Sequence, residues 1–321
     1  MPLAVITLEF DPVLRLGDWA VRWETLGIGA AILVGLVLAG LLAGRAHLPS
    51  RADGTPGGHL RRDDLLMIAV GIVPGAIVGG RLTYVALHLD YYASHPGAIV
   101  DPASGGLALS GAVVLGALSA GLVARLFDAP IGRWYEAAAL PMLVVLALGK
   151  AANVLGGTGQ GLPSAADWAT RYLGPGPWGS LGPAVPSHPA QAAEAIAVGL
   201  VLAVVLVTSV VGGFRAHDGR GFALAVGGWA AARFAVAGTW RDPTVVGPLR
   251  VEQVIDLAIV GLALVILVWL MVRARRERQA RAAQPETRPE ARAEVQWPAA
   301  VGPERDGVSS LTDTPPPRGL R

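Results

Sequence analysis

Seven apolar stretches, each close to the length of a membrane-spanning helix, constrain this sequence more than any other feature. A helix needs about 20 apolar residues to cross the hydrocarbon core of a bilayer. The stretches are residues 23–42, 65–87, 106–124, 137–155, 192–211, 221–236 and 254–272, of which the sixth is the shortest. Only 16% of the residues are charged, against roughly 25% in ordinary soluble domains. We therefore predict an all-α, polytopic membrane protein with about seven transmembrane helices.

The distribution of arginines predicts the orientation of the chain in the membrane. Cytoplasmic loops carry an excess of basic residues, and here the segments after the first, third and fifth stretches are basic, whereas residues 88–105 have no Lys or Arg. These basic residues are Arg45, Arg51, Arg61, Arg62, Arg125, Arg133, Arg215 and Arg220. The pattern predicts that the N-terminus lies outside and that the C-terminal tail is cytoplasmic.

Two segments outside the stretches differ in composition. Residues 156–189 are rich in Gly and Pro and contain aromatic residues, which favours an outward-facing cap or a loop at the interface. Residues 274–321 are charged and Pro-rich, a composition typical of disorder. We therefore divide the chain into a membrane domain over residues 1–273 and a disordered cytoplasmic tail. The chain contains no cysteine, so any reacting thiol must come from a partner.

Ionisable residues inside apolar stretches are costly and usually functional. Arg81, Lys150 and Arg233 lie deep in their stretches or at the outward end, where the positive-inside rule predicts few cations. Lys150 is the only lysine among 26 basic residues. Glu24, Glu194 and Asp256 lie near the starts of stretches, where placement at the interface explains them equally well. Gly71, Gly75 and Gly79 recur every four residues, which indicates close helix packing.

Six motifs occur in the order and spacing of one known family. They are "VLRLGDWAVRWETLG", "GGRLTYV", "SGGLALSGAVVLG", "GKAANVLGGTGQG", "SHPAQAAEA" and "ARFAVAGTWRDP". Over residues 13–273 the sequence resembles the bacterial prolipoprotein diacylglyceryl transferases. The family signature Gly-Arg-x-Gly-Asn-Phe-x-Asn-Gly-Glu-x-x-Gly aligns with residues 149–161, where Asn153 and Gly161 match and Lys150 replaces the arginine.

The resemblance implies a reaction in the bacterial plasma (inner) membrane. The sn-1,2-diacylglyceryl group of phosphatidylglycerol moves to the lipobox cysteine of a prolipoprotein signal peptide as a thioether, and glycerol phosphate leaves. Such a site needs cations for the phosphate, help in forming a thiolate and a central cavity open to lipid. We expect no cofactor, no metal and no nucleic-acid partner. The predicted catalytic residues are Lys150, Arg233, Asn153 and His188, and the predicted substrate-binding residues are Lys150, Arg81, Gly161, Ser110 and Glu194.

Several positions depart from the family pattern. The histidine of its third span aligns with Ser110, a tyrosine with Trp229 and another tyrosine with Glu24. Two glutamates align with Thr158 and Ala237. Lysine binds phosphate as a point charge rather than through a planar fork, so Lys150 is a candidate phosphate ligand or, if desolvated, a base. It is alternatively a side chain that reaches the outer headgroups.

These departures leave three functional alternatives. The first is an active transferase with an altered catalytic set, in which His188 of "SHPAQ" is a candidate base or else only a loop residue before the fifth span. The second is a degenerate paralogue that binds lipid or a membrane partner without transferring anything. The third is an unrelated transporter or channel. Transporters often contain internal repeats, and we find none in this sequence, which argues against this alternative.

Overall fold

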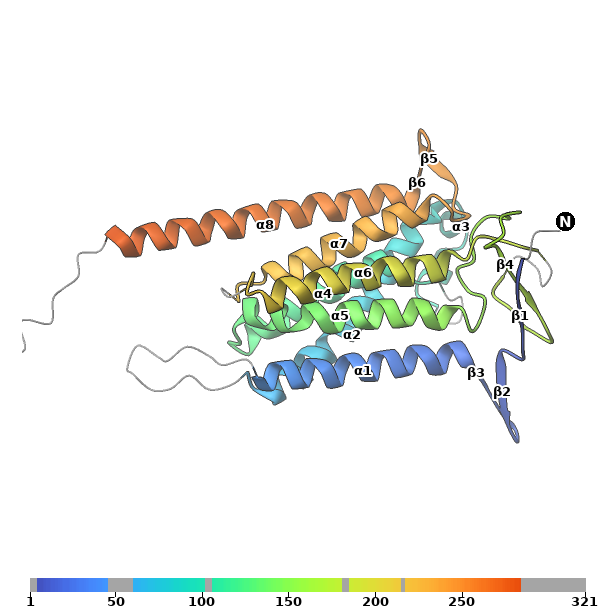
Figure 1. The fold of residues 1–321 in the computed structure, drawn as a ribbon, viewed down its shortest axis with the longest axis horizontal. Coiled ribbons are helices and arrows are strands. Elements are labelled where there is room, and N and C mark those ends of the chain that lie inside the picture. Colours follow the sequence, from blue (N-terminus) through green and yellow to red (C-terminus); the bar gives the residue numbers. More distant parts are fainter. Residues whose placement is uncertain (1–4, 46–59, 102–105, 181–184, 215–216, 284–321) are drawn as a thin grey trace, which may run out of the picture. The chain divides into compact units, whose positions relative to one another are not determined.

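The computed structural model describes residues 5–45, 60–101, 106–180, 185–214 and 217–283. It divides into two units, Met1–Arg275 and Arg276–Arg321, and the first contains the candidate site. The helices are α1 (Trp23–Arg45), α2 (Arg62–Leu87), α3 (Leu89–Ser94), the 3₁₀ helix η1 (Pro96–Ile99), α4 (Leu109–Leu126), α5 (Ile131–Asn153), α6 (Ala190–Val210), α7 (Arg220–Ala237) and α8 (Val251–Ala283) (Figure 1). Arg51, Arg215 and the tail beyond Ala283 lie outside the described residues.

Six helices within the described ranges are long and apolar enough to cross a membrane, namely α1, α2, α4, α5, α6 and α8. The prediction of an all-α, polytopic membrane protein is therefore confirmed. The sixth predicted stretch forms α7, which is as long as α4 but less apolar than the six spans. Its buried residues include the large Trp229 and Arg233 among small alanines. Helix α8 continues past the predicted tail boundary at residue 274 and ends at Ala283, because Ala, Arg, Gln and Glu are good helix formers.

The glycine repeat of α2 packs against α4. A Cβ atom on Gly79 would collide with the carbonyl oxygen of Gly111, and one on Gly71 would collide with Val123. Ser119 donates a 2.6 Å hydrogen bond from its hydroxyl to the carbonyl of Gly71. Close approach of the two backbones therefore depends on small residues, as the sequence predicts.

The largest hydrophobic core of the described residues lies among α5, α6, α7 and α8. Leu143 of α5, Val198 of α6, Trp229 of α7 and Ile259 of α8 are buried there. Helix α5 also packs against α1, where Gly35 lies directly against Val145. This core supports the ends of α5, α6, α7 and α8 at which the candidate site is built.

Short strands occupy the connections at one end of these helices (Figure 1). The pairs are β1 (Ile6–Glu9) parallel to β4 (Thr170–Leu173), β2 (Val13–Leu16) antiparallel to β3 (Trp19–Arg22), and β5 (Thr244–Val246) antiparallel to β6 (Leu249–Arg250). In the first pair Ile6 lies opposite Thr170. The Gly/Pro-rich segment expected to form a cap thus contains β4 and is tied to the start of the chain.

Candidate functional site

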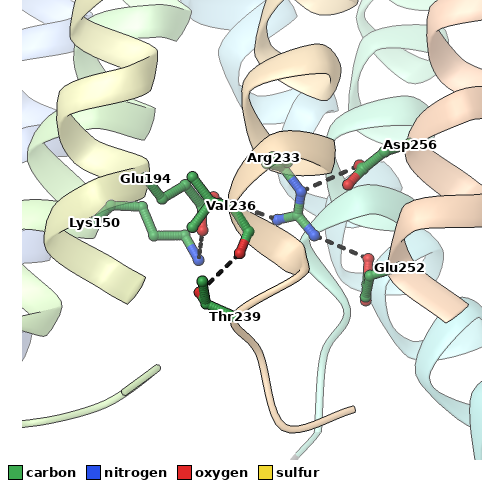
Figure 2. Close-up of polar contacts among 7 residues, drawn as sticks. All are labelled: Lys150, Glu194, Arg233, Val236, Thr239, Glu252 and Asp256. Atoms are coloured by element: carbon green, nitrogen blue, oxygen red, sulfur yellow. Dashed lines mark hydrogen bonds and ion pairs between the residues drawn. The ribbon is translucent and has the colours of Figure 1, made fainter. Parts of the chain in front are cut away.

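Five charged side chains from four helices meet at the helix ends that lie beside the short strands (Figure 1). Figure 2 shows these side chains and their contacts. They are Lys150 of α5, Glu194 of α6, Arg233 of α7, and Glu252 and Asp256 of α8, and we call them the charge cluster. Lys150 is in the last turn of α5, whereas Glu252 is in the first turn of α8. Antiparallel helices therefore bring residues distant in sequence to the same level.

Glu194 links the two cations of the charge cluster. Its Oε2 lies 2.9 Å from Lys150 Nζ, and its Oε1 lies 3.6 Å from Arg233 Nη1. The remaining nitrogens of Arg233 face α8, with Nη2 2.9 Å from Glu252 Oε2 and Nε 3.3 Å from Asp256 Oδ1. Each nitrogen of the guanidinium therefore faces a different carboxylate.

Burial divides the charge cluster into an inner and an outer part. The side chains of Arg233, Glu194 and Asp256 are 2%, 1% and 0% exposed, whereas those of Lys150 and Glu252 are 18% and 13% exposed. Breaking a buried ion pair by removing one partner is costly, since it leaves an uncompensated charge. The inner residues are thus enclosed, and Lys150 and Glu252 are the members of the charge cluster with exposed surface.

Aromatic rings flank both cations. The Trp240 ring centroid lies 4.8 Å from the Arg233 guanidinium carbon and 5.6 Å from Lys150 Nζ, and the Trp229 centroid lies 5.1 Å from the same guanidinium. Cation–π contacts at these distances are attractive. Trp240 lies three residues after the end of α7 and is half-buried, so it covers the two cations without enclosing them.

Gly161 and His188 belong to the segment that contacts the end of α7. The Gly161 amide donates to the His188 carbonyl (2.8 Å), and the Leu162 amide donates to the Thr239 carbonyl (2.8 Å). A Cβ atom on Gly161 would collide with the Thr239 carbonyl oxygen, which explains why glycine is needed there. Thr239 is the residue before Trp240, so this glycine positions the turn that carries the tryptophan over the cations.

The predicted catalytic residues Asn153 and His188 make contacts chiefly through their backbones. The Asn153 carbonyl accepts from the amides of Gly156 and Thr158, each at 3.2 Å. The His188 ring is tilted against Trp168, with centroids 4.8 Å apart, and its Nδ1 is buried without a hydrogen-bond partner. Both residues shape the loops beside the charge cluster.

Arg81 and Ser110 are held by other parts of the molecule. Arg81 Nε donates to the Ile99 carbonyl (2.8 Å), Nη1 donates to that of Gly106 (3.1 Å), and Nη2 donates to that of Ala98. The guanidinium carbon also lies 5.3 Å from the centroid of the Tyr92 ring. Ser110 is 1% exposed near the start of α4, and its hydroxyl has no hydrogen-bond partner.

Two positions that depart from the resembled family pattern are in direct contact. The Thr158 hydroxyl donates to Glu24 Oε2 (2.9 Å), and Arg22 Nη2 donates to the same oxygen (3.0 Å). Arg22 also donates to the Gly156 carbonyl (3.3 Å). A carboxylate therefore lies beside the loop after α5 although its signature glutamate is replaced by threonine.

Sequence reasoning missed several buried or charged neighbours of the site. It did not single out Glu252, although this residue precedes Asp256 by one helical turn. It also missed Gln191, which is buried and donates to the Tyr172 hydroxyl (3.0 Å). Burial raises the pKa of Tyr172 to about 12. The amide in "SHPAQ", three residues before Glu194, was the available signal.

Comparisons with known proteins agree on one family. The family model described as prolipoprotein diacylglyceryl transferase matches residues 12–269. A phosphatidylglycerol–prolipoprotein diacylglyceryl transferase of Nostoc sp. is 30% identical over 284 residues, covering 86% of this chain and 94% of that protein. Proteins of the same name from Symbiobacterium thermophilum and Beijerinckia indica are 30% and 34% identical; the matches cover 82% and 64% of this chain, and 94% and 72% of those proteins.

Proposed function

The chain belongs to the prolipoprotein diacylglyceryl transferase family, and from this premise we propose the reaction and the residues that perform it. The transferred group is the sn-1,2-diacylglyceryl moiety of phosphatidylglycerol, and the acceptor is the lipobox cysteine thiol of a prolipoprotein signal peptide. A carbon–sulfur bond forms at the glyceryl carbon, and the carbon–oxygen bond to phosphate breaks. Glycerol phosphate leaves, and the product is a thioether.

One observation carries this proposal, namely the pair of cations that Glu194 holds together. Lys150 and Arg233 both contact its carboxylate and both lie beside the Trp240 ring. Negative charge develops on the phosphate as the carbon–oxygen bond breaks, and preorganised cations stabilise such charge most when water is excluded. The pair is therefore the group that we assign to the phosphate.

The two cations have different parts in this assignment. Arg233 is 2% exposed and held from three sides, so its guanidinium sets the place and direction of the positive field. Lys150 is 18% exposed and, within the described part of the chain, forms one ion pair, with Glu194. A flexible ammonium group is a good phosphate ligand even though it lacks the bidentate fork of arginine. Lys150 is thus the cation that reaches the incoming headgroup.

The altered positions support an active enzyme rather than a degenerate paralogue. Where the resembled pattern has a glutamate, Thr158 is hydrogen-bonded to Glu24 from another element. Ala237 also replaces a glutamate, and carboxylates of α8 contact Arg233 instead. Loss of function by neutral drift gives no reason for carboxylates to be kept at both places. We therefore favour the transferase.

The proposed location is the bacterial plasma membrane, with the charge cluster on the outer side. The described helices establish a membrane protein, and the basic connections that predict the cytoplasmic side are at the other ends of α4 and α6. The lipobox cysteine of a secreted precursor would reach the site from the outer half of the bilayer. Orientation is testable by adding single cysteines, since the chain has none.

The decisive experiment is complementation in cells depleted of their own transferase. A reporter lipoprotein is examined by mass spectrometry for thioether-linked diacylglyceryl, with wild type, Lys150→Ala, Lys150→Arg and, as a control outside the charge cluster, Arg171→Ala of β4, which is half-buried. We expect modification by wild type, by Lys150→Arg and by the control. We expect a loss of about 10²-fold in Lys150→Ala, typical of removing one stabilising group. An unmodified reporter with stably expressed wild type would contradict the proposed function.

A further inference from the structure

The charge cluster contains more negative than positive groups. Three carboxylates, Glu194, Glu252 and Asp256, surround two cations, Lys150 and Arg233. If all five were ionised, the sum would be −1. A site that must accept an anionic phosphodiester in a low-dielectric environment cannot gain a further negative charge without a large electrostatic penalty. This penalty becomes smaller if one carboxylate becomes neutral during the reaction, as negative charge develops on the leaving phosphate.

Only one of the three carboxylates is placed to exchange a proton with a substrate. Glu194 holds both cations and is 1% exposed, and Asp256 is fully enclosed. Glu252 is 13% exposed, contacts a single guanidinium nitrogen, and lies in the first turn of α8. A proton on Glu252 would also release Nη2 of Arg233, which is then free to contact a phosphate oxygen.

The reaction supplies a proton at this place. A thiol must lose its proton to become a good nucleophile, and its ordinary pKa is about 8.5. The residue aligned with the family histidine is Ser110, which is buried and cannot act as a base. The groups facing Glu252 are Arg233 from α7 and, through it, Glu194 of α6 and Asp256 on its own helix. Among the residues that the structure describes, the ion-pair partner of Glu252 is Arg233.

We propose that Glu252 is a catalytic residue, the proton acceptor for the substrate thiol. The S–H proton moves to the Glu252 carboxylate, and the thiolate attacks the glyceryl carbon that bears the phosphate. The S–C bond forms and the C–O bond breaks, with its electron pair leaving on the phosphate oxygen of glycerol phosphate. Arg233, released from Glu252, stabilises that oxygen, and Glu252 then returns its proton to the leaving phosphate.

The inference rests on the proposed function, because it uses the same thiol and the same leaving group. It adds a residue from α8 that neither the motif positions nor the resemblance assigned. It also explains a feature of the geometry that phosphate binding alone does not, namely why an arginine meant for a phosphate has all three nitrogens facing carboxylates. In this proposal the Glu252 carboxylate is paired with Arg233 until it accepts the thiol proton, and protonation then breaks the ion pair.

The test compares Glu252→Gln with Asp256→Asn in the full-length protein in nanodiscs containing phosphatidylglycerol. Both changes remove one negative charge next to Arg233, but only the first removes the proposed proton acceptor. We expect Glu252→Gln to lower kcat for transfer to a lipobox peptide by about 10²- to 10⁴-fold. We also expect it to bind phosphatidylglycerol several-fold more tightly than wild type, since the charge sum changes from −1 to 0.

The pH dependence provides a readout that a structural role would not change. Without an acceptor the reaction depends on thiolate formed in solution, so the rate of Glu252→Gln should rise about tenfold per pH unit below pH 8.5. Wild type and Asp256→Asn should share a flatter profile. Near-wild-type kcat in Glu252→Gln, or equal losses and parallel pH profiles in the two variants, would overturn the proposal.

Failure of the proposed function is distinguishable from failure of this inference. If wild type transfers nothing from phosphatidylglycerol, both are overturned. If wild type and Glu252→Gln transfer equally well, only the proton acceptor is overturned and the transferase stands. Thermal unfolding of each variant in the same nanodiscs separates loss of catalysis from loss of fold.

Discussion

Arg233 and Arg81 are both arginines that the sequence places near the outward ends of apolar stretches, yet the structure surrounds them differently. Arg233 contacts three carboxylates on two neighbouring helices. Arg81 donates to backbone carbonyls of η1 and of the segment before α4. A carboxylate can be neutralised by a proton, whereas a backbone carbonyl cannot. An arginine whose partners are carboxylates can therefore lose a partner when that partner is protonated, whereas an arginine bound to backbone carbonyls keeps its contacts.

Removing Arg233 should have the largest effect. Arg233→Ala leaves Asp256 buried without a cation and Glu194 with Lys150 alone, and breaking a buried ion pair costs about 3–5 kcal/mol. We expect a corresponding fall in the free energy of unfolding, measured by chemical denaturation in detergent, and transfer below detection. Arg233→Lys keeps one charge but not the three-way fork, so it should recover part of the stability and little of the activity. Full activity in Arg233→Ala would place the reaction elsewhere.

Removing Arg81 should have a smaller effect of a different kind. Arg81→Ala leaves several carbonyls without their donor, and each unsatisfied buried group costs about 1–3 kcal/mol, less where water enters. We expect lower stability, but an activity per folded molecule within about tenfold of wild type and an unchanged KM for phosphatidylglycerol. A KM raised tenfold or more would instead assign Arg81 to the substrate phosphate, as the sequence predicts. The comparison between the two arginines would then no longer hold.

The smallest expected effects come from the aromatic rings beside the two arginines. Cation–π contacts contribute about 0.5–2 kcal/mol, so Trp240→Leu and Tyr92→Leu should destabilise the protein by similar amounts. Only Trp240 also contacts Lys150, and therefore only Trp240→Leu should change KM for phosphatidylglycerol. Kinetics of the two variants at matched folded concentration would show the difference. Equal changes in KM would mean that the rings have no distinct relation to the substrate.

The fold was largely predictable because membrane spans are encoded locally. Hydrophobic length is a property of short windows, and it located the six helices that can cross a membrane. Residues 221–236 were harder, because α7 is shielded by neighbouring helices and does not need the hydropathy of a lipid-exposed span. The end of α8 was missed for another reason, since the polar residues after its apolar stretch remain helical through their own propensity.

The site was predictable only in part. Lys150 and Arg233 stood out, because cations are costly at those positions. Glu252 did not stand out, since an acidic residue at the start of a span has an ordinary explanation at the interface. Its proposed role depends on a contact with Arg233 across 19 residues of sequence. Nothing in the sequence pattern around either residue encodes that contact.

The sequence by itself determined the class of the protein, the approximate spans and the family, because these depend on composition, hydrophobic length and motif order. The tertiary structure decided which charges meet. Glu194 joins Lys150 to Arg233, and α8 supplies the remaining carboxylates. Electrostatic interactions act through space and depend on distance and burial. Separation along the chain therefore carries little information about them.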